Sequence, residues 1–316
     1  MTTLRYTLTP LTAFGTAISG DTLFGQLCWT LRNQLGDDRL RSLLSDYTDG
    51  MPFAVVSDAL PKGHLPLPAV PSGAWVNPGN LDRKTLKKKR WVPVEALSNR
   101  SSTWQSLALS DQDLISAKEA AQPHNSINRS TGTTGTGAFA PYTTEQIWFK
   151  PGSQFDLYVV LDEAKLSINE LSAALELIGH TGYGRDASIG LGKFRLDSTP
   201  EPVKWHVSAA SNSYLTLAPC APQGQGFCAV RSTWQVMTRF GRHGDVAVAM
   251  GNPFKKPILL SQTGALFWPE NIDLTCRHIG QGVGGRTTPI SFVMPDTVHQ
   301  GYAPVIPIER PTEIAV

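Results

Sequence analysis

Residues 168–196 read INELSAALELIGHTGYGRDASIGLGKFRL and predict a helix, a glycine-rich loop and a strand in close succession. The apolar residues of the helix recur at helical spacing and are Ile168, Leu171, Leu175 and Ile178. Residues 182–193 hold four glycines, two cations and one acid, and residues 194–196 predict a short strand. Because glycine lets a backbone approach a ligand and aim successive N–H groups one way, this loop is a candidate polyanion site.

The loop does not match the common phosphate-binding motifs. In a Walker loop, Ala187 would stand where the first glycine belongs, and Phe194 would replace the hydroxyl that binds Mg²⁺. Gly182, Gly184 and Ala187 match a relaxed dinucleotide motif, but that motif follows a strand and this loop follows a helix. The sequence therefore supports neither nucleotide hydrolysis nor hydride transfer, and we expect no cofactor. A flexible surface loop is the alternative interpretation.

Composition limits the remaining classes of function. The chain has 316 residues, 41% of them hydrophobic, which suits one large domain or two ordinary ones. Its formal net charge is +2, so any nucleic-acid contact must come from local clusters of cations. The four cysteines show no C-x-x-C pair and no zinc-ligand spacing, so we expect no metal site. Without a signal peptide or a long apolar run, we expect a cytoplasmic protein that does not enter a membrane.

The order of predicted elements favours an α+β fold. The first 200 residues predict strand, helix, strand, strand, helix and strand, which is the ferredoxin-like (RRM-like) arrangement. The predicted strands are residues 4–8, 53–57, 155–161 and 194–196, and the helices are residues 23–35, capped by Asp21, and 168–178. Prolines and charges at residues 198–202 mark a domain junction. We therefore expect a ferredoxin-like domain over residues 1–200, interrupted by an insertion at residues 59–150.

The remainder, residues 201–316, looks mainly β. Strands are expected at residues 214–217 and 228–240, and helical periodicity is weak throughout this part. A degenerate second ferredoxin-like domain over residues 201–316 fits this pattern, although no internal repeat is visible in the sequence.

The insertion at residues 59–150 has an unusual composition. Residues 83–90 hold six cations in eight residues, and no acid occurs from residue 122 to residue 144. Long loops of this kind are usually functional or disordered, and a solvated face or mobile linker is the alternative for each segment. A basic run near a flexible segment without acids favours contacts along an RNA backbone.

Six segments together resemble the RAMP superfamily of CRISPR effector subunits, and within it the fourth Csm subunit of type III-A complexes. They are residues 19–25 (SGDTLFG), 56–61 (VSDALP), 128–132 (NRSTG), 178–194, 251–257 (GNPFKKP) and 298–307 (VHQGYAPVIP). They follow the family's order over nearly the whole chain. Residues 56–61 depart slightly from the aromatic-containing version of the family's motif.

The resemblance implies a non-catalytic subunit that holds the repeat-derived 5′ handle of the crRNA with two ferredoxin-like units. It implies two protein neighbours, a large polymerase/cyclase-like subunit and the first backbone RAMP subunit of the Csm complex, with target RNA met indirectly. Relatives project a thumb-like β-hairpin that wedges between guide nucleotides, and residues 125–137 are the segment expected to form it here. The resemblance carries over no catalytic residues.

The physical chemistry of RNA binding suggests roles for individual residues. In the loop, backbone approach is expected at Gly182, Gly184, Gly190 and Gly192, phosphate contact at Ser188 and main-chain N–H groups, and charge neutralisation at Arg185 and Lys193. Asp186 would repel phosphate, so it should orient Arg185 or cap a turn. Elsewhere the expected RNA-binding residues are Arg129 and Thr131 in the thumb, Lys87, Lys88, Lys89 and Arg90, Lys255, Lys256 and Arg286, and His299 and Tyr302 as stacking rings. The alternatives are that Lys87 to Arg90 meet the acidic surface of a partner and that His299 is a core histidine.

Two other functions remain open from the sequence. Some RAMP relatives are metal-independent endoribonucleases that process precursor crRNA, and His180, Tyr183 and Lys193 are the residues that would serve as acid and base. Alternatively, the chain is a structural adaptor whose basic segments bind only protein.

Overall fold

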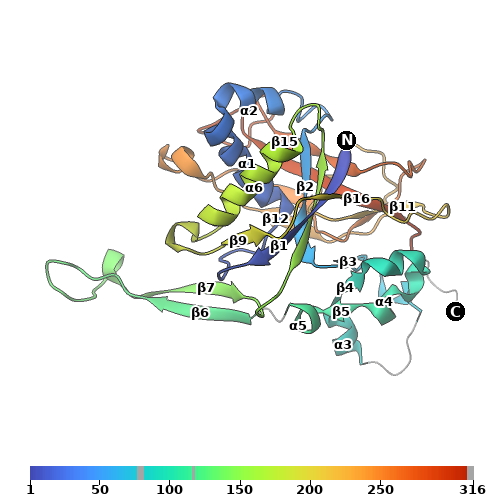
Figure 1. The fold of residues 1–316 in the computed structure, drawn as a ribbon, viewed down its shortest axis with the longest axis horizontal. Helices are drawn as coiled ribbons and strands as arrows, with labels where there is room; N and C mark the ends of the chain where they lie inside the picture. Colours follow the sequence, from blue (N-terminus) through green and yellow to red (C-terminus); the bar gives the residue numbers. More distant parts are fainter. Residues whose placement is uncertain (77–81, 116–117, 312–316) are drawn as a thin grey trace.

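The computed structural model describes residues 1–76, 82–115 and 118–311, and it has an α+β fold built from antiparallel sheets (Figure 1). In the first sheet, β1 (Thr2–Pro10) pairs with β8 (Phe155–Leu161), which pairs in turn with β2 (Ala54–Pro61). The other edge of β1 pairs with β9 (Phe194–Leu196) and β10 (Glu201–Pro202). All four strands predicted for the first 200 residues are therefore present.

Two helices pack on this sheet, α1 (Gly20–Leu35) and α6 (Ile168–Thr181), and α2 (Asp37–Leu44) follows α1. Alternate residues of β1 and the apolar stripes of both helices enter one buried core, as the periodicity predicted. Ser167 caps α6 in a capping box with Glu170. The predicted cap of the first helix is wrong, because Ser19 precedes α1 and Asp21 lies inside its first turn with a buried carboxylate.

The insertion is folded over most of its length, so the expectation of a long loop is wrong. A small sheet contains β3 (His64–Pro66), β4 (Lys89–Pro93) and β5 (Leu109–Ser110). Short helices surround it: η1 (Ser72–Ala74), α3 (Arg83–Lys88), η2 (Val94–Ser98), η3 (Ser101–Thr103), α4 (Trp104–Leu107) and α5 (Asp111–Leu114). Trp104 and Val92 share an apolar cluster with Leu215 and Ile306 of the second half, which anchors this small sheet. Short strands with little alternation give no periodic signal, which explains the error.

A second part of the insertion is a hairpin that projects from the body (Figure 1). Its strands are β6 (Lys118–His124) and β7 (Tyr142–Trp148), and η4 (Gly137–Phe139) lies near its end. The base is tied to the body because Phe14 and Ile147 exchange backbone hydrogen bonds of 2.9 and 2.8 Å. The hairpin expected in this region is present, and residues 125–137 form its end rather than its strands.

The second half is mainly β, as predicted. One sheet has the order β14 (Leu266–Phe267), β11 (Ser213–Thr216), β16 (Val298–Ile308) and β15 (His278–Gly284). A separate hairpin is formed by β12 (Val236–Arg239) and β13 (Ile258–Ser261), and η6 (Asp245–Ala249) lies between these strands. The long strand predicted at residues 228–240 is wrong except at its end, because the Ser232 N–H bonds to the Cys228 carbonyl in a turn that leaves Val230 89% exposed.

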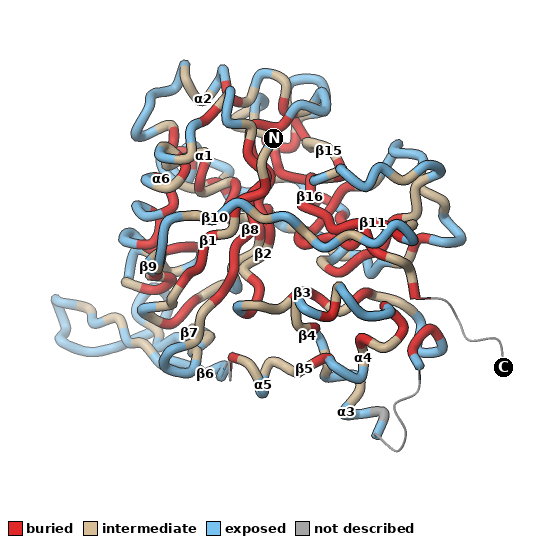
Figure 2. The backbone as a smooth tube through the Cα atoms, turned by 45° about the vertical axis from the view of Figure 1, so that its right-hand side comes forward, coloured by how far each residue is buried: buried red, intermediate tan, exposed pale blue. Residues whose placement is uncertain are grey.

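The deepest burial runs through the two main sheets, whereas the β6–β7 hairpin is largely exposed (Figure 2). β16 is buried along almost its whole length and contacts both α1 and β2. The two halves of the chain are thus packed together, and the domain division at residue 200 stays a prediction. Among the helices of the described ranges, none is long and apolar enough to cross a membrane.

Candidate RNA-binding surface

The glycine loop, residues 182–193, turns tightly between α6 and β9 and contains the short helix η5 (Ala187–Ile189). Gly182 and Gly192 have φ values of +102° and +74°, and a Cβ at either position would overlap a carbonyl oxygen of the loop itself. These two glycines are therefore required by the loop's own packing, and their approach to a ligand stays a prediction. Gly184 packs against Thr16, whereas Gly190 faces open space.

The loop rests on residues 11–19, which connect β1 to α1. The Gly192 N–H donates to the Ala13 carbonyl at 2.8 Å, and the Lys193 N–H donates to Thr12 Oγ1 at 3.0 Å. The Arg185 N–H lies 3.3 Å from Thr16 Oγ1. Much of the loop backbone that was expected to meet phosphate is thus hydrogen-bonded to residues 11–19. What the loop offers a ligand is mainly side chains, including the exposed Ser188 and Ile189.

Arg185 links this loop to the projecting hairpin. Its Nη2 donates to the Glu145 carbonyl of β7 at 2.7 Å, and its Nε lies 3.3 Å from the Asp186 carboxylate. Asp186 has a left-handed backbone and sits where η5 begins, but its side chain makes no capping hydrogen bond there, so of its two predicted roles the pairing with Arg185 is the one present. The Arg185 side chain stays 53% exposed, and Lys193 forms no ion pair with the described residues. Arg185 is thus accessible to an anion, while Lys193 is half-buried and unpaired within the described part of the chain.

The end of the hairpin is an ordered turn with exposed side chains. Asn128 Oδ1 accepts the Ser130 N–H at 2.9 Å, while Arg129 and Thr131 are exposed. Two apolar residues that sequence reasoning missed also lie here, Ile127 at 60% and Phe139 at 37% exposure. The sequence does contain a signal for these two residues, because each is an isolated apolar residue in a segment rich in Gly, Ser and Thr. Behind them the His124 and Tyr142 rings stack at 5.2 Å.

The basic run at residues 83–90 is divided between two roles. Lys89 donates to the carbonyls of Gln105 and Ser106, and Arg90 pairs with Asp111 at 3.1 Å. These two residues therefore bind the chain itself, while Lys87 and Lys88 on α3 are exposed. α3 lies below the small sheet, far from the glycine loop beside β9 (Figure 1). The structure does not bring this run and the loop together.

Two predicted stacking residues are buried. His299 is 5% exposed and Tyr302 is 1% exposed, because both lie on the buried strand β16. The Tyr302 hydroxyl donates to the Tyr47 carbonyl at 2.7 Å, and its ring packs edge-on against the Tyr47 ring. The prediction that these rings stack on a base is wrong, and His299 is the core histidine of the alternative interpretation.

The other predicted cations of the second half have local partners. Arg286 forms an exposed ion pair with Asp296, and the Lys256 ammonium lies 5.2 Å from the centroid of the Phe292 ring. Lys255 is half-buried with its stem against Gly241, and burial lowers the pKa of its ammonium group. Of these three, Lys256 is the one that is both exposed and without an ion-pair partner among the described residues, so it is the best placed to contact RNA.

A buried polar network joins the start of α1 to the second half. Asp21 is fully buried and accepts hydrogen bonds from Arg239 Nε at 2.6 Å and Arg239 Nη2 at 3.0 Å, and His299 Nε2 lies 3.1 Å away. Burial alone would raise the pKa of Asp21, but His299 and Arg239 outweigh it, so the pKa lies well below its usual range. Beside it, burial raises the pKa of Asp58 to about 6.

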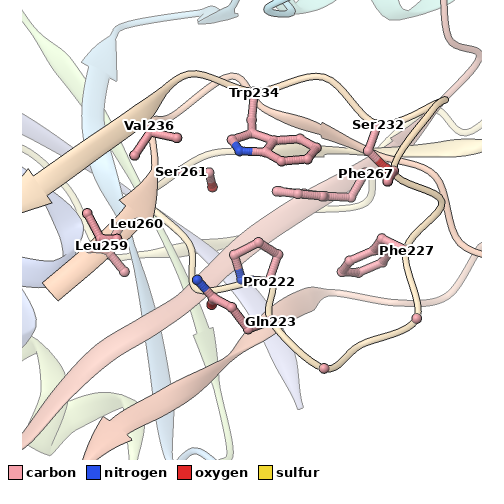
Figure 3. Close-up of a pocket in the computed structure, with 13 residues that line it drawn as sticks. Pro222, Gln223, Phe227, Ser232, Trp234, Val236, Leu259, Leu260, Ser261 and Phe267 are labelled. Atoms are coloured by element: carbon pink, nitrogen blue, oxygen red, sulfur yellow. The ribbon is translucent and has the colours of Figure 1, made fainter.

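An apolar pocket of about 360 Å³ lies beside the β12–β13 hairpin (Figure 3). The Trp234 ring stacks on Phe267 at 5.8 Å, and Phe227 packs against the same ring at 5.0 Å. None of the residues that line the pocket is charged. Its walls therefore give no selectivity for a polyanion.

The residues of the endoribonuclease alternative differ sharply in exposure. Tyr183 is fully buried, its hydroxyl donates to the Ala17 carbonyl and accepts the Ser19 N–H, and burial raises its pKa. His180 is exposed on α6. A buried phenol that is already hydrogen-bonded on both sides is poorly placed to exchange a proton with RNA.

No protein-family model matches the sequence, and the search of curated proteins found no match. Solved structures do match. The chain is similar to one in the crystal structure of a Csm1–Csm4 cassette in complex with pppApA, with 14% identity, a TM-score of 0.61 and coverage of 98% of this chain and 99% of that chain. A Csm3–Csm4 subcomplex of the type III-A CRISPR-Cas interference complex gives 14% identity, a TM-score of 0.60 and coverage of 96% and 99%.

Csm4 is the component that these two structures share. The fold is Csm4-like. The resemblance to the fourth Csm subunit, stated above from six sequence segments, is thus confirmed by a similarity that spans nearly the entire chain. At this level of identity the similarity establishes the fold, and function must be argued from the surface.

Proposed function

We propose that this chain is a non-catalytic, RNA-binding subunit of a cytoplasmic type III CRISPR ribonucleoprotein, in which it holds the 5′ handle of the crRNA. The first sheet supports a ferredoxin-like unit, because its strand order is β9–β1–β8–β2 with α1 and α6 packed on it. The β11–β16 sheet would be the degenerate second unit.

One observation carries the proposal: Arg185 joins the glycine loop to the base of the projecting hairpin. The loop supplies the exposed Arg185 and the half-buried Lys193, and the hairpin supplies an end with Arg129, Ile127 and Phe139 exposed. A single strand is bound through its phosphates and its unstacked bases, so cations beside an exposed apolar end suit it. We infer that the backbone of the handle runs past the loop while the hairpin end separates two of its bases.

The proposed protein neighbours follow from the complexes in which similar chains occur. One of the solved structures contains Csm1 with Csm4, and the other contains Csm3 with Csm4. We therefore propose that this chain joins a large polymerase/cyclase-like subunit to the backbone RAMP subunits, and that it meets target RNA only through the guide.

The test is retention of guide RNA by the assembled complex. The complex with wild-type chain should bind handle-bearing RNA more tightly than RNA with a scrambled handle. The double variant Arg185→Ala, Lys193→Ala should bind more weakly and lose about 1.4 units of salt slope, since each phosphate contact with a single strand contributes about 0.7. Arg41→Ala is the matched control, because Arg41 is an exposed arginine on α2 that pairs with Asp37. Equal binding by wild type and double variant would refute the assigned site.

A further inference from the structure

One side of α1 connects the glycine loop to a distant part of the chain. Gln26 and Asn33 lie two turns apart on this side, with Trp29 between them. The Gln26 amide donates to the Gly182 carbonyl at 2.7 Å, and its oxygen accepts the Gly184 N–H at 3.2 Å. The Asn33 amide donates to Asp245 Oδ2 at 2.7 Å. The surface of the loop therefore continues across α1 to the segment between β12 and β13.

Trp29 makes the middle contact of this connection. A Cβ built on Gly244 would lie 3.4 Å from the Trp29 ring, so the chain between β12 and β13 passes directly over the indole. In Figure 1 the glycine loop, the helix η6 and the β6–β7 hairpin all lie toward the same side of the body. The three features can be reached by one extended ligand.

Aromatic rings and cations are paired along this surface. The Arg32 guanidinium lies 5.4 Å from the Trp29 ring centroid, and the Arg242 guanidinium lies 6.0 Å from that of Phe254. A third pair is Lys256 with Phe292, at 5.2 Å. Two of the rings are unusually exposed, Phe254 at 60% and Phe292 at 68%. Such rings gain nothing from the core and are available to a partner.

The charge of the same segment selects the kind of partner. Residues 231–256 contain five cations and one acid, Asp245, which is already bonded to Asn33. Arg239 neutralises the buried Asp21, and Arg32 forms an ion pair with Asp37. This leaves Arg242 and Lys256 beside exposed rings without an ion-pair partner among the described residues. A surface with excess positive charge and open rings fits a single-stranded polyanion with aromatic bases better than it fits another protein.

We infer that Arg242 with Phe254 and Lys256 with Phe292, which follow the Trp29 contact along this surface, form a stacking platform for single-stranded guide RNA. This inference rests on the proposed function, because it extends the RNA path from the glycine loop across α1. Bases stack on the rings of Phe254 and Phe292, and the flanking phosphates lie against Arg242 and Lys256. The platform holds nucleotides adjacent to those at the loop.

The test uses the assembled complex and replaces rings by aliphatic side chains. Phe254→Leu and Phe292→Leu each remove a π-face but keep an apolar side chain. Each should weaken RNA binding about fivefold, the lower end of the stacking contribution per base, and should leave the salt slope unchanged. Lys256→Ala should lower the slope by about 0.7. The matched control is Phe240→Leu, because Phe240 is 74% exposed in the same segment and no described cation lies over its ring.

The outcomes separate this inference from the proposed function. Handle binding that depends on Arg185 and Lys193 but is unchanged in both phenylalanine variants refutes the platform alone. Loss of a neighbouring subunit from the variant complexes, with RNA binding unchanged in those that assemble, identifies a protein-docking surface and also refutes it. Photocrosslinking of 4-thiouridine-substituted guide RNA to residues 242–256 or 292 supports the platform, and its absence from a complex that does crosslink elsewhere counts against it.

Discussion

Removing Arg239 should strongly destabilise the protein, because it would leave a buried carboxylate short of its main partner. The Asp21 side chain has no exposed surface, and Arg239 reaches it with two nitrogens while its own side chain remains 22% exposed. Breaking a buried ion pair by deleting one partner costs about 3–5 kcal/mol. His299 still contacts Asp21 in the Arg239→Met variant, so we expect the free energy of unfolding to fall by about 3 kcal/mol, the lower end of that range.

The measurement is the free energy of unfolding from chemical denaturation at neutral pH, together with the double variant Arg239→Met, Asp21→Asn. The double variant should be more stable than Arg239→Met alone, since a neutral amide is easier to bury than an unpaired charge. A loss below about 1 kcal/mol for Arg239→Met, or no recovery in the double variant, would refute the reasoning.

The pH dependence provides an independent check on the same network. The pKa of Asp21 in the folded protein lies below its ordinary value of 3.8, so its stabilisation is present above that pH and is lost as the pH falls. In Arg239→Met the folded-state pKa should rise toward that value. The stability difference between wild type and variant should therefore shrink below about pH 4. A difference that stays constant into acid would mean that Arg239 acts through packing instead of charge.

Three further predictions concern the loop, the second buried acid and catalysis. Gly192→Ala should lower the thermal midpoint clearly more than Gly190→Ala. Both positions have a left-handed backbone, but only at Gly192 would the added Cβ also overlap a carbonyl oxygen. Equal effects of the two substitutions would refute the packing role of Gly192. The pKa of Asp58 is raised to about 6, so the folded protein still binds a proton at pH values above 3.8, where the unfolded chain has released it. The stability of the wild type should therefore fall relative to that of Asp58→Asn as the pH rises from 3.8 to about 6. Parallel pH profiles of the two proteins would contradict this. Finally, the purified chain should leave repeat RNA uncut in EDTA, and specific cleavage products on a denaturing gel would revive the endoribonuclease alternative.

The sequence predicted those features that depend on regular periodicity. β8 is apolar except at Asp156 and α6 has a clear apolar stripe, so both were located from the sequence within a few residues. The small sheet of β3, β4 and β5 was missed because its strands are two to five residues long and their stability comes from tertiary contacts. The positions of Trp104 and Leu215 in one cluster illustrate this, since their distance along the chain gives no local signal.

The site was predicted less well, for a different reason. Glycines and cations were recognised as residue types, but a sequence does not say whether a glycine makes room for a ligand or for its own chain. Gly182 and Gly192 make room for the loop itself, and of the four loop glycines only Gly190 faces open space. Similarly, Lys89 and Arg90 bind carbonyls and a carboxylate of the insertion, which adjacent cations in a sequence cannot reveal. The aromatic–cation pairs were missed altogether, because each pair joins residues whose significance depends on exposure.

The meeting of the glycine loop and the hairpin, by contrast, follows from strand order and register. Leu8 near the end of β1 pairs with Phe155 at the start of β8, and Pro61 at the end of β2 pairs with the same residue. Pro10 pairs with Phe194 at the start of β9. The β1–α1 connection, both ends of the insertion and the glycine loop therefore all leave the sheet at one end. A binding surface built there can lengthen through the insertion without disturbing the core, because the strands that fix its base remain paired. The proposed RNA site, a short, tightly packed loop beside a long projecting hairpin, is thus a consequence of inserting residues between two adjacent strands of this sheet.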